Sequence, residues 1–229
     1  MAREVLDRKI RHLLDEILVL DSMVESAVTD AVTALKNHDL NLAQQVYNYD
    51  RQINAKRYEL ENDCIVTIAT QQPIMAGDLR LLASILEVVS ELERMGDYAK
   101  GIAHVCLRID LQPHIKPLID IPRMASISVD MLHRSVEAFV TANAELARSI
   151  PPEDDLVDDL YVQVYRELVT IMFTKPDTID QANLLMWAAH NLERLADRVT
   201  NICERTIYVA TGQLKEIASS DDEMLKIEE

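Results

Sequence analysis

Residues that mark β-structure, disulfide frameworks and membrane spans are scarce in this chain of 229 residues. Its four glycines and 4% aromatic residues exclude a β-sandwich or β-barrel, because those folds need many turn residues and strand-favouring rings. Three widely spaced cysteines without a C-x-x-C pair are typical of reduced thiols in a helical core rather than of disulfides or a zinc site. No apolar run reaches about eighteen residues and the N-terminus has no apolar signal segment, so we expect a cytoplasmic protein that does not insert into a membrane.

Positive charge is also in short supply, since 23 lysines and arginines face 39 aspartates and glutamates, for a formal net charge of −16. Nucleic acid is therefore excluded as a partner, because binding to its phosphates needs a surplus of lysine and arginine on one face. Anionic membrane surfaces are disfavoured for the same reason. A cation or a basic protein surface is the natural counterpart of this charge, while solubility alone is the simpler explanation of it.

Helix-forming residues are plentiful, and 48% hydrophobic residues provide ample material for a core. Apolar residues recur at steps of three and four, the spacing of one helix face, and predict six long helices. Asp39 and Asp78 are predicted to cap the second and third of them, and Gly212 to end the last. The predicted helices cover about residues 3–37, 39–71, 79–107, 122–141, 154–174 and 178–211, with a short helical piece from Asn143 that Pro151 and Pro152 interrupt.

The segment Leu92–Asp97 (LERMGD) returns as Leu192–Asp197 (LERLAD), which indicates a duplicated unit. Five of the eleven positions are identical between residues 92–102 and 192–202, and an earlier segment repeats at a shift of 104 residues. We therefore expect an all-α fold of two tandem up-down-up three-helix bundles related by internal duplication. The first bundle is expected over residues 1–112, the second over 113–212, and an acidic tail over 213–229.

Acidic or amide side chains four residues apart share one face of a helix, and each half of the chain has two such pairs. The two pairs lie on helices that are expected to run antiparallel, and counting from the turns places them at one height. In the first half they form the first acidic set: Asp50, Asn54, Glu93 and Asp97. In the second half they form the second acidic set: Asp154, Asp158, Glu193 and Asp197.

Carboxylates gathered in this way repel one another and must be neutralised by protonation, by arginine or by a metal ion. Arg94 and Arg194 stand beside the two signatures and offer a purely structural solution, an arginine–carboxylate lattice. A metal ion on oxygen ligands would be Mg²⁺, Ca²⁺, Mn²⁺ or iron rather than zinc or copper. The pattern thus fits either a metal-binding protein or a metal-free helical scaffold.

Enzyme chemistry has weaker support in the sequence. A ferritin-like carboxylate-bridged oxidase needs Glu-x-x-His on two helices, and this motif does not occur. His104, His133 and His190 are scattered, and we interpret them as ordinary helix residues. No Gly-x-Ser-x-Gly motif, glycine-rich phosphate loop or plausible Cys/His pairing is found, which argues against nucleophilic catalysis. The enzyme alternative is therefore a carboxylate-bridged metal oxidase or hydrolase.

The doubled Glu-Arg-x-x-Asp signature, Asp78-Leu79-Arg80 and Asn201-Ile202-Cys203-Glu204 closely resemble the PhoU family of phosphate-signalling regulators. The resemblance covers nearly the whole chain, and it implies a cytoplasmic, dimeric, non-enzymatic protein with multinuclear metal, often iron, on its acidic pairs. It also implies negative regulation of the phosphate-starvation response through a sensor histidine kinase and the ATPase of the phosphate ABC transporter.

Carried onto this sequence, the resemblance makes the two acidic sets the metal ligands. Asn54 replaces a carboxylate in the first acidic set. Lys100-Gly101-Ile102 also stands where the second half has Thr200-Asn201-Ile202. We therefore expect the second acidic set to be the more complete metal site.

Overall fold

The computed structural model describes residues 2–214, and every regular element in that range is helical. Apart from its first two residues, the expected tail 213–229 lies outside the described residues. Among the described residues, no helix combines the length and apolar character needed to cross a membrane. The helices are α1 (Ala2–Asn37), α2 (Leu40–Thr70), α3 (Ala76–Ile109), α4 (Asp120–Val140), α5 (Ala144–Ser149), α6 (Asp154–Thr174) and α7 (Ile179–Thr211), with 3₁₀ turns η1 (Pro151–Glu153) and η2 (Pro176–Thr178).

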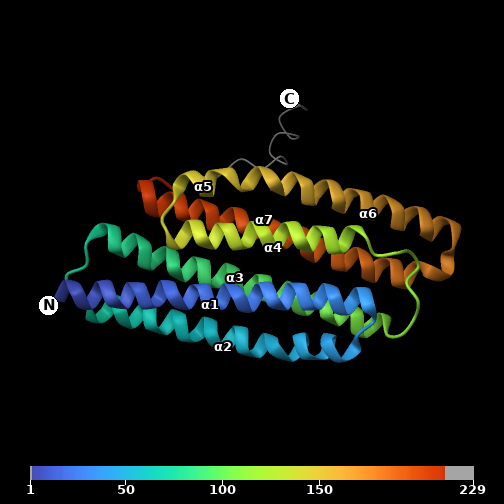
Figure 1. Ribbon diagram of the computed structural model, residues 1–229, viewed down its shortest axis with the longest axis horizontal. Helices are drawn as coiled ribbons and strands as arrows, with labels where there is room; N and C mark the ends of the chain where they lie inside the picture. The colour runs from blue at the N-terminus through green and yellow to red at the C-terminus, as the bar shows by residue number, and fades with distance from the viewer. Residues whose placement is uncertain (1, 215–229) are drawn as a thin grey trace.

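The long helices form two three-helix bundles that lie side by side along the long axis of the molecule (Figure 1). Helices α1, α2 and α3 make the first bundle, and α4, α6 and α7 make the second, with α5 leading into α6. Between the bundles, α1 packs on α4 and α3 packs on α7. The predicted all-α fold with an internal duplication is confirmed.

The apolar face of α1 shows why the bundles pack as they do. Leu13, Ile17, Leu20, Val24 and Val28 recur at steps of three and four and are at most 1% exposed. They belong to one continuous hydrophobic core that includes residues of both bundles. Burial of this much apolar surface on a shared helix holds the two halves in a defined relation to each other.

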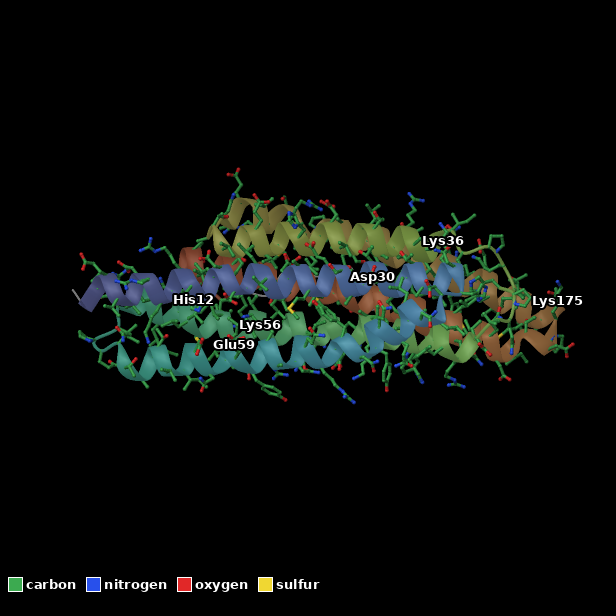
Figure 2. All side chains as sticks on the ribbon, turned by 60° about the horizontal axis from the view of Figure 1, so that its bottom comes forward. His12, Asp30, Lys36, Lys56, Glu59 and Lys175 are labelled. Carbon is green, nitrogen blue, oxygen red and sulfur yellow. The ribbon has the colours of Figure 1, made fainter. Side chains whose placement is uncertain are left out.

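Side chains with nitrogen and oxygen atoms project from the outer faces of the helices (Figure 2). Some of them form ion pairs between neighbouring helices. Lys56 of α2 pairs with Glu16 of α1, and its ammonium also lies 3.1 Å from the carboxylate of Glu59. Ion pairs at the surface contribute little, at most about 1 kcal/mol each where they are exposed, so the core rather than the surface determines the packing.

The loops that enter α2 and α5 are built alike. The carboxylate of Asp39 accepts a hydrogen bond from the backbone N–H of Leu42 at 3.0 Å, which confirms Asp39 as the N-cap of α2. At the equivalent position, Asn143 accepts from the backbone of α5. His38 and Ala142, which precede the two caps, both have positive φ, 54° and 51°. The duplication therefore extends to the backbone of the turns.

Helix α3 begins earlier than its sequence suggests. Met75 is the N-cap residue and provides no side-chain hydrogen bond. Asp78, predicted as the cap, lies inside the first turn, so that prediction is wrong. Its carboxylate pairs with Arg3 of α1, where it also complements the positive end of the α3 dipole.

Replacing the Asp39 cap by alanine should destabilise the protein by about 1 kcal/mol, because one backbone N–H at the start of α2 loses its acceptor. Urea unfolding followed by circular dichroism measures this difference. Asp39→Asn is the matched control and should unfold close to wild type, since asparagine caps helices about as well as aspartate. Equal losses in both variants would show that the charge, rather than the cap, stabilises α2.

Candidate metal centres

The second acidic set lies where the N-terminus of α6 meets the middle of α7. Asp154 is the first residue of α6 and Asp158 follows one turn later, while Glu193 and Asp197 come from α7. Burial raises the pKa of Asp154 to about 8, and the negative charges of Asp158, Asp197 and Glu193 add to this rise. The fold therefore brings these four carboxylates within electrostatic reach of one another.

The carboxyl group of Asp154 has a buried oxygen without a hydrogen-bond donor. Oδ1 of Asp154 is buried and accepts no hydrogen bond, although a carboxylate oxygen of this kind normally has a partner when it leaves water. On α7, Nδ1 of His190 lies 3.0 Å from Oε2 of Glu193, an ion pair whenever the imidazole is protonated. Burial and the charge of Glu193 also raise the pKa of Tyr161. The second acidic set thus contains a buried carboxyl group with a raised pKa, and the side chains of His190 and Tyr161 interact with its member Glu193.

The first acidic set differs because two cations of the protein reach into it. Asp50 is only 4% exposed, and its Oδ2 accepts hydrogen bonds from Nζ of Lys100 at 2.7 Å and from Nδ2 of Asn54 at 3.1 Å. Arg57 lies 2.9 Å from Glu93. Burial, Asp50 and Glu93 together raise the pKa of Asp97, against the opposing effect of Lys100. The first acidic set is thus partly neutralised from within.

The repeat shows how the two halves came to differ. Lys100 corresponds to Thr200, and Arg57 corresponds to Tyr161. Both positions that carry a cation in the first half therefore carry an uncharged side chain in the second.

Arg94 and Arg194, which the sequence suggested as the neutralising partners of the acidic sets, contact Glu91 and Tyr98. The guanidinium of Arg94 lies 3.6 Å from Glu91, and that of Arg194 lies over the ring of Tyr98 at 5.0 Å from its centroid. The neutralising cations of the first acidic set are Arg57 and Lys100 instead. Each stands three residues beyond a member of the set, a spacing that places it on the same helix face.

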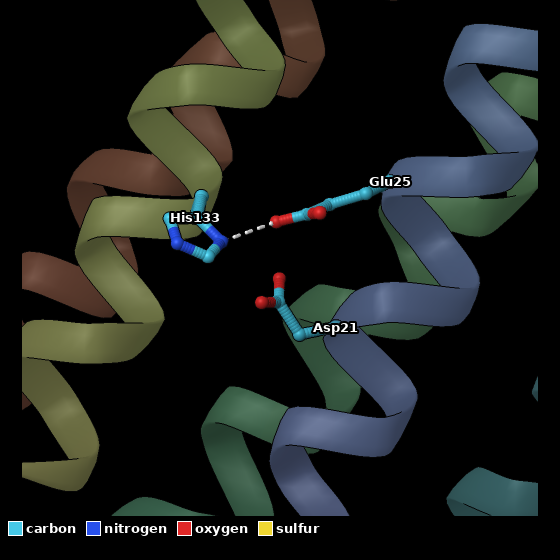
Figure 3. A group of neighbouring side chains, drawn as sticks. All are labelled: Asp21, Glu25 and His133. Atoms are coloured by element: carbon cyan, nitrogen blue, oxygen red, sulfur yellow. Dashed lines mark hydrogen bonds and ion pairs between the residues drawn. The ribbon is translucent and has the colours of Figure 1, made fainter.

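A third group, which the sequence did not reveal, joins the two bundles (Figure 3). Asp21 and Glu25 of α1 face His133 of α4, and one potential ligand atom from each lies within 4.8 Å of the other two. We call this group the inter-bundle cluster. It could hold a metal ion, and His133, expected above to be an ordinary helix residue, contacts Glu25 across the boundary between the bundles. The four-residue spacing of Asp21 and Glu25 was the available signal, but the contact with His133 exists only because α1 packs on α4.

A duplicated helical protein with one carboxylate set in each half is the class that this fold and these sites define. The family model described as the PhoU domain matches the chain twice, over residues 17–106 and 121–206. The chain therefore belongs to the PhoU family, a non-enzymatic family of accessory and regulatory proteins of phosphate transport.

Individual relatives agree with this assignment. The phosphate-specific transport system accessory protein PhoU homolog of Clostridium acetobutylicum is 35% identical over 93% of this chain and 97% of its own length. The PhoU protein of Escherichia coli is 33% identical over 90% of this chain and 85% of its own. Crystal structures of PhoU proteins from Streptococcus pneumoniae and Pseudomonas aeruginosa superpose with TM-scores of 0.86 and 0.85, at 30% and 34% identity. The superposition with the Streptococcus pneumoniae structure covers 93% of this chain and 100% of that one. The superposition with the Pseudomonas aeruginosa structure covers 90% of this chain and 99% of that one.

Proposed function

We propose that this protein is a cytoplasmic negative regulator of the phosphate-starvation response. In this proposal it acts by binding a sensor histidine kinase and the ATPase of the phosphate ABC transporter. The observation that carries the proposal is the presence of two PhoU domains in a chain that aligns with accessory proteins of phosphate transport over most of their length. Membership of a non-enzymatic family leaves binding, rather than turnover, as its mode of action.

In this proposal the two acidic sets are the sites at which the regulator binds metal ions. The second acidic set is the principal site, because the buried, donor-free oxygen of Asp154 and the mutual repulsion around it call for a cation. Carboxylate oxygens favour iron, Mn²⁺, Mg²⁺ or Ca²⁺, and four of them suffice for more than one ion. In the first acidic set an ion has to compete with Lys100 for Asp50, so we expect weaker binding there.

Exposed aromatic side chains support docking onto partners and onto a second copy of the chain. Phe173 at the end of α6 is 84% exposed, and Tyr58 of α2 and Trp187 of α7 are each at least 60% exposed. Large rings of this kind are enriched at the energetic centres of protein interfaces. We therefore propose a homodimer whose remaining helix faces receive the kinase and the ATPase.

Deletion of the gene should leave the phosphate regulon active in phosphate-rich medium, because the signal that represses the kinase would be missing. A reporter fused to a phosphate-starvation promoter measures this, and complementation with the wild-type gene should restore repression. Normal repression in the deletion strain would overturn the proposed function.

Cross-linked pull-down from phosphate-rich cells should recover the kinase or the ATPase.

Complementation with a Glu193→Gln/Asp197→Asn variant separates the metal-dependent regulator from a metal-free scaffold. The regulator requires the second acidic set, so this variant should repress poorly although it is produced and folded. Full repression would instead support the scaffold, in which the carboxylates have only a structural role.

A further inference from the structure

The inter-bundle cluster shares no residue with either acidic set and differs from them in that it includes a histidine. Asp21 and Glu25 are four residues apart on α1 and point from one helix face toward α4 (Figure 3). His133 of α4 meets them with its imidazole, and its Nδ1 lies 3.0 Å from Oε1 of Glu25. Two carboxylates and a ring nitrogen therefore converge from two different bundles.

Asp21 is the unusual member of the cluster. It is only 4% exposed, and its Oδ1 is buried without a hydrogen-bond partner. Figure 3 shows this carboxylate directed into the space between Glu25 and His133. A surface ion pair between His133 and Glu25 would not require a third, buried carboxyl group beside it, because a buried oxygen such as Oδ1 of Asp21 costs free energy when it has no hydrogen-bond partner.

We propose that the inter-bundle cluster binds one divalent transition-metal ion through a carboxylate oxygen of Asp21, a carboxylate oxygen of Glu25 and Nδ1 of His133. A mixed nitrogen and oxygen ligand set favours Zn²⁺, Fe²⁺ or Mn²⁺ over Mg²⁺ and Ca²⁺, which prefer oxygen alone. This preference distinguishes the inter-bundle cluster from the all-oxygen acidic sets.

The distances permit such a site with small side-chain movements. Metal–ligand bonds of about 2.0–2.2 Å place tetrahedral ligand atoms roughly 3.4 Å apart. The three potential ligand atoms already lie within 4.8 Å of one another, and two of the residues approach to 3.0 Å. The side chains of His133 and Glu25 are 64% and 24% exposed, so water can reach the ion and complete its coordination.

The consequence of binding is a bridge between the two bundles. Asp21 and Glu25 belong to the first bundle and His133 to the second, so one ion would connect α1 directly to α4. An ion that binds only the assembled arrangement stabilises it over any state in which the two helices separate. The inter-bundle cluster therefore links metal supply to the relative position of the halves.

Zinc titration of the full-length, metal-stripped protein tests this proposal. Wild type should bind one more Zn²⁺ per chain than Asp21→Asn or His133→Gln, with the affinity at this site reduced about tenfold or more in either variant. A threefold excess of Mg²⁺ over Zn²⁺ should leave this one site filled with zinc. Nitrogen NMR of the imidazoles should show that one equivalent of Zn²⁺ shifts the resonance of His133.

His12→Gln is the matched control. His12 also lies on α1 beside a carboxylate, with Nδ1 3.8 Å from Glu16, but it stands outside the inter-bundle cluster (Figure 2). This variant should bind as much zinc as wild type. Equal zinc stoichiometry in wild type and both cluster variants, or zinc binding that leaves the His133 resonance unmoved, would overturn the proposal. The NMR measurement on wild type decides the matter even if a variant folds poorly.

Discussion

Exchange of Glu193 for glutamine and of Asp197 for asparagine should abolish the metal binding that we propose for the second acidic set. The two substitutions remove both carboxylates that α7 contributes and leave the shape of the side chains nearly unchanged. Loss of even an indirect partner of a metal ligand weakens binding about 10- to 100-fold, so loss of two direct ligands should weaken it by more than about 100-fold. Elemental analysis of protein purified without a histidine tag measures the metal per chain.

The equivalent exchange in the first half is the matched control. Glu93→Gln/Asp97→Asn should change the metal content less, because Lys100 and Arg57 already neutralise part of the first acidic set. Equal metal content in wild type and the Glu193→Gln/Asp197→Asn variant would remove the second acidic set as a metal site.

A reciprocal exchange tests the physical reason for this difference. Thr200→Lys places the cation of the first half at the equivalent position of the second, and should lower metal binding there. Lys100→Thr frees Asp50 from its ammonium partner and should raise metal binding in the first acidic set. Unchanged binding in both variants would show that Lys100 does not explain the difference between the halves.

The helices and their ends were largely predictable because local rules determine them. The three- and four-residue spacing located every long helix, and Asp39 and Gly212 act as caps through backbone geometry that their own residue types favour. The prediction of Asp78 as the N-cap of α3 was wrong, although aspartate is a favoured N-cap residue. In the structure Asp78 lies inside the first turn of α3 and pairs with Arg3 of α1. A preference that long-range contact overrides cannot be recognised from local sequence.

The proximity of the acidic side chains within each set was predictable because the duplication repeats their spacing and the turns determine the pairing of antiparallel helices. Metal binding by the two sets stays a prediction. Their neutralisation was not predictable. Lys100 and Arg57 contact acids of a neighbouring helix, and only the packed side chains show this.

The inter-bundle cluster required still more information. A repeat defines the interior of each bundle, but it does not specify how one bundle docks on the other. The approach of His133 to Asp21 and Glu25 follows from that docking alone. Contacts between side chains of different bundles therefore could not be predicted from this sequence.

Replacement of Asp154 by asparagine should stabilise the metal-free protein, and more so at about pH 8 than at about pH 5. The folded protein raises the pKa of Asp154 from an ordinary 3.8 to about 8, chiefly through burial and then through Asp158, Asp197 and Glu193. The folded state therefore binds this proton more tightly than the unfolded chain does. The resulting stability is fully present below the unfolded pKa and is lost as the pH rises through the folded pKa.

Asparagine does not ionise, so the variant escapes this loss. At about pH 8 the free energy of unfolding of Asp154→Asn should exceed that of wild type by about 1–3 kcal/mol. This figure allows for solvent screening and for the favourable position of a carboxylate at the start of α6. Urea unfolding in the presence of a chelator at the two pH values measures it. Asp155→Asn changes an exposed neighbour and should alter stability by no more than about 0.5 kcal/mol.

Added metal should reverse the sign of the Asp154→Asn effect. A bound cation makes the carboxylate of Asp154 favourable, so wild type gains stability from the ion that the variant cannot gain to the same degree. The comparison thus separates a carboxylate kept for metal binding from one that only burdens the fold. If the variant is the more stable protein both with chelator and with saturating Fe²⁺ or Mn²⁺, Asp154 is not a ligand, and the repulsion within the second acidic set has to be relieved by protonation instead.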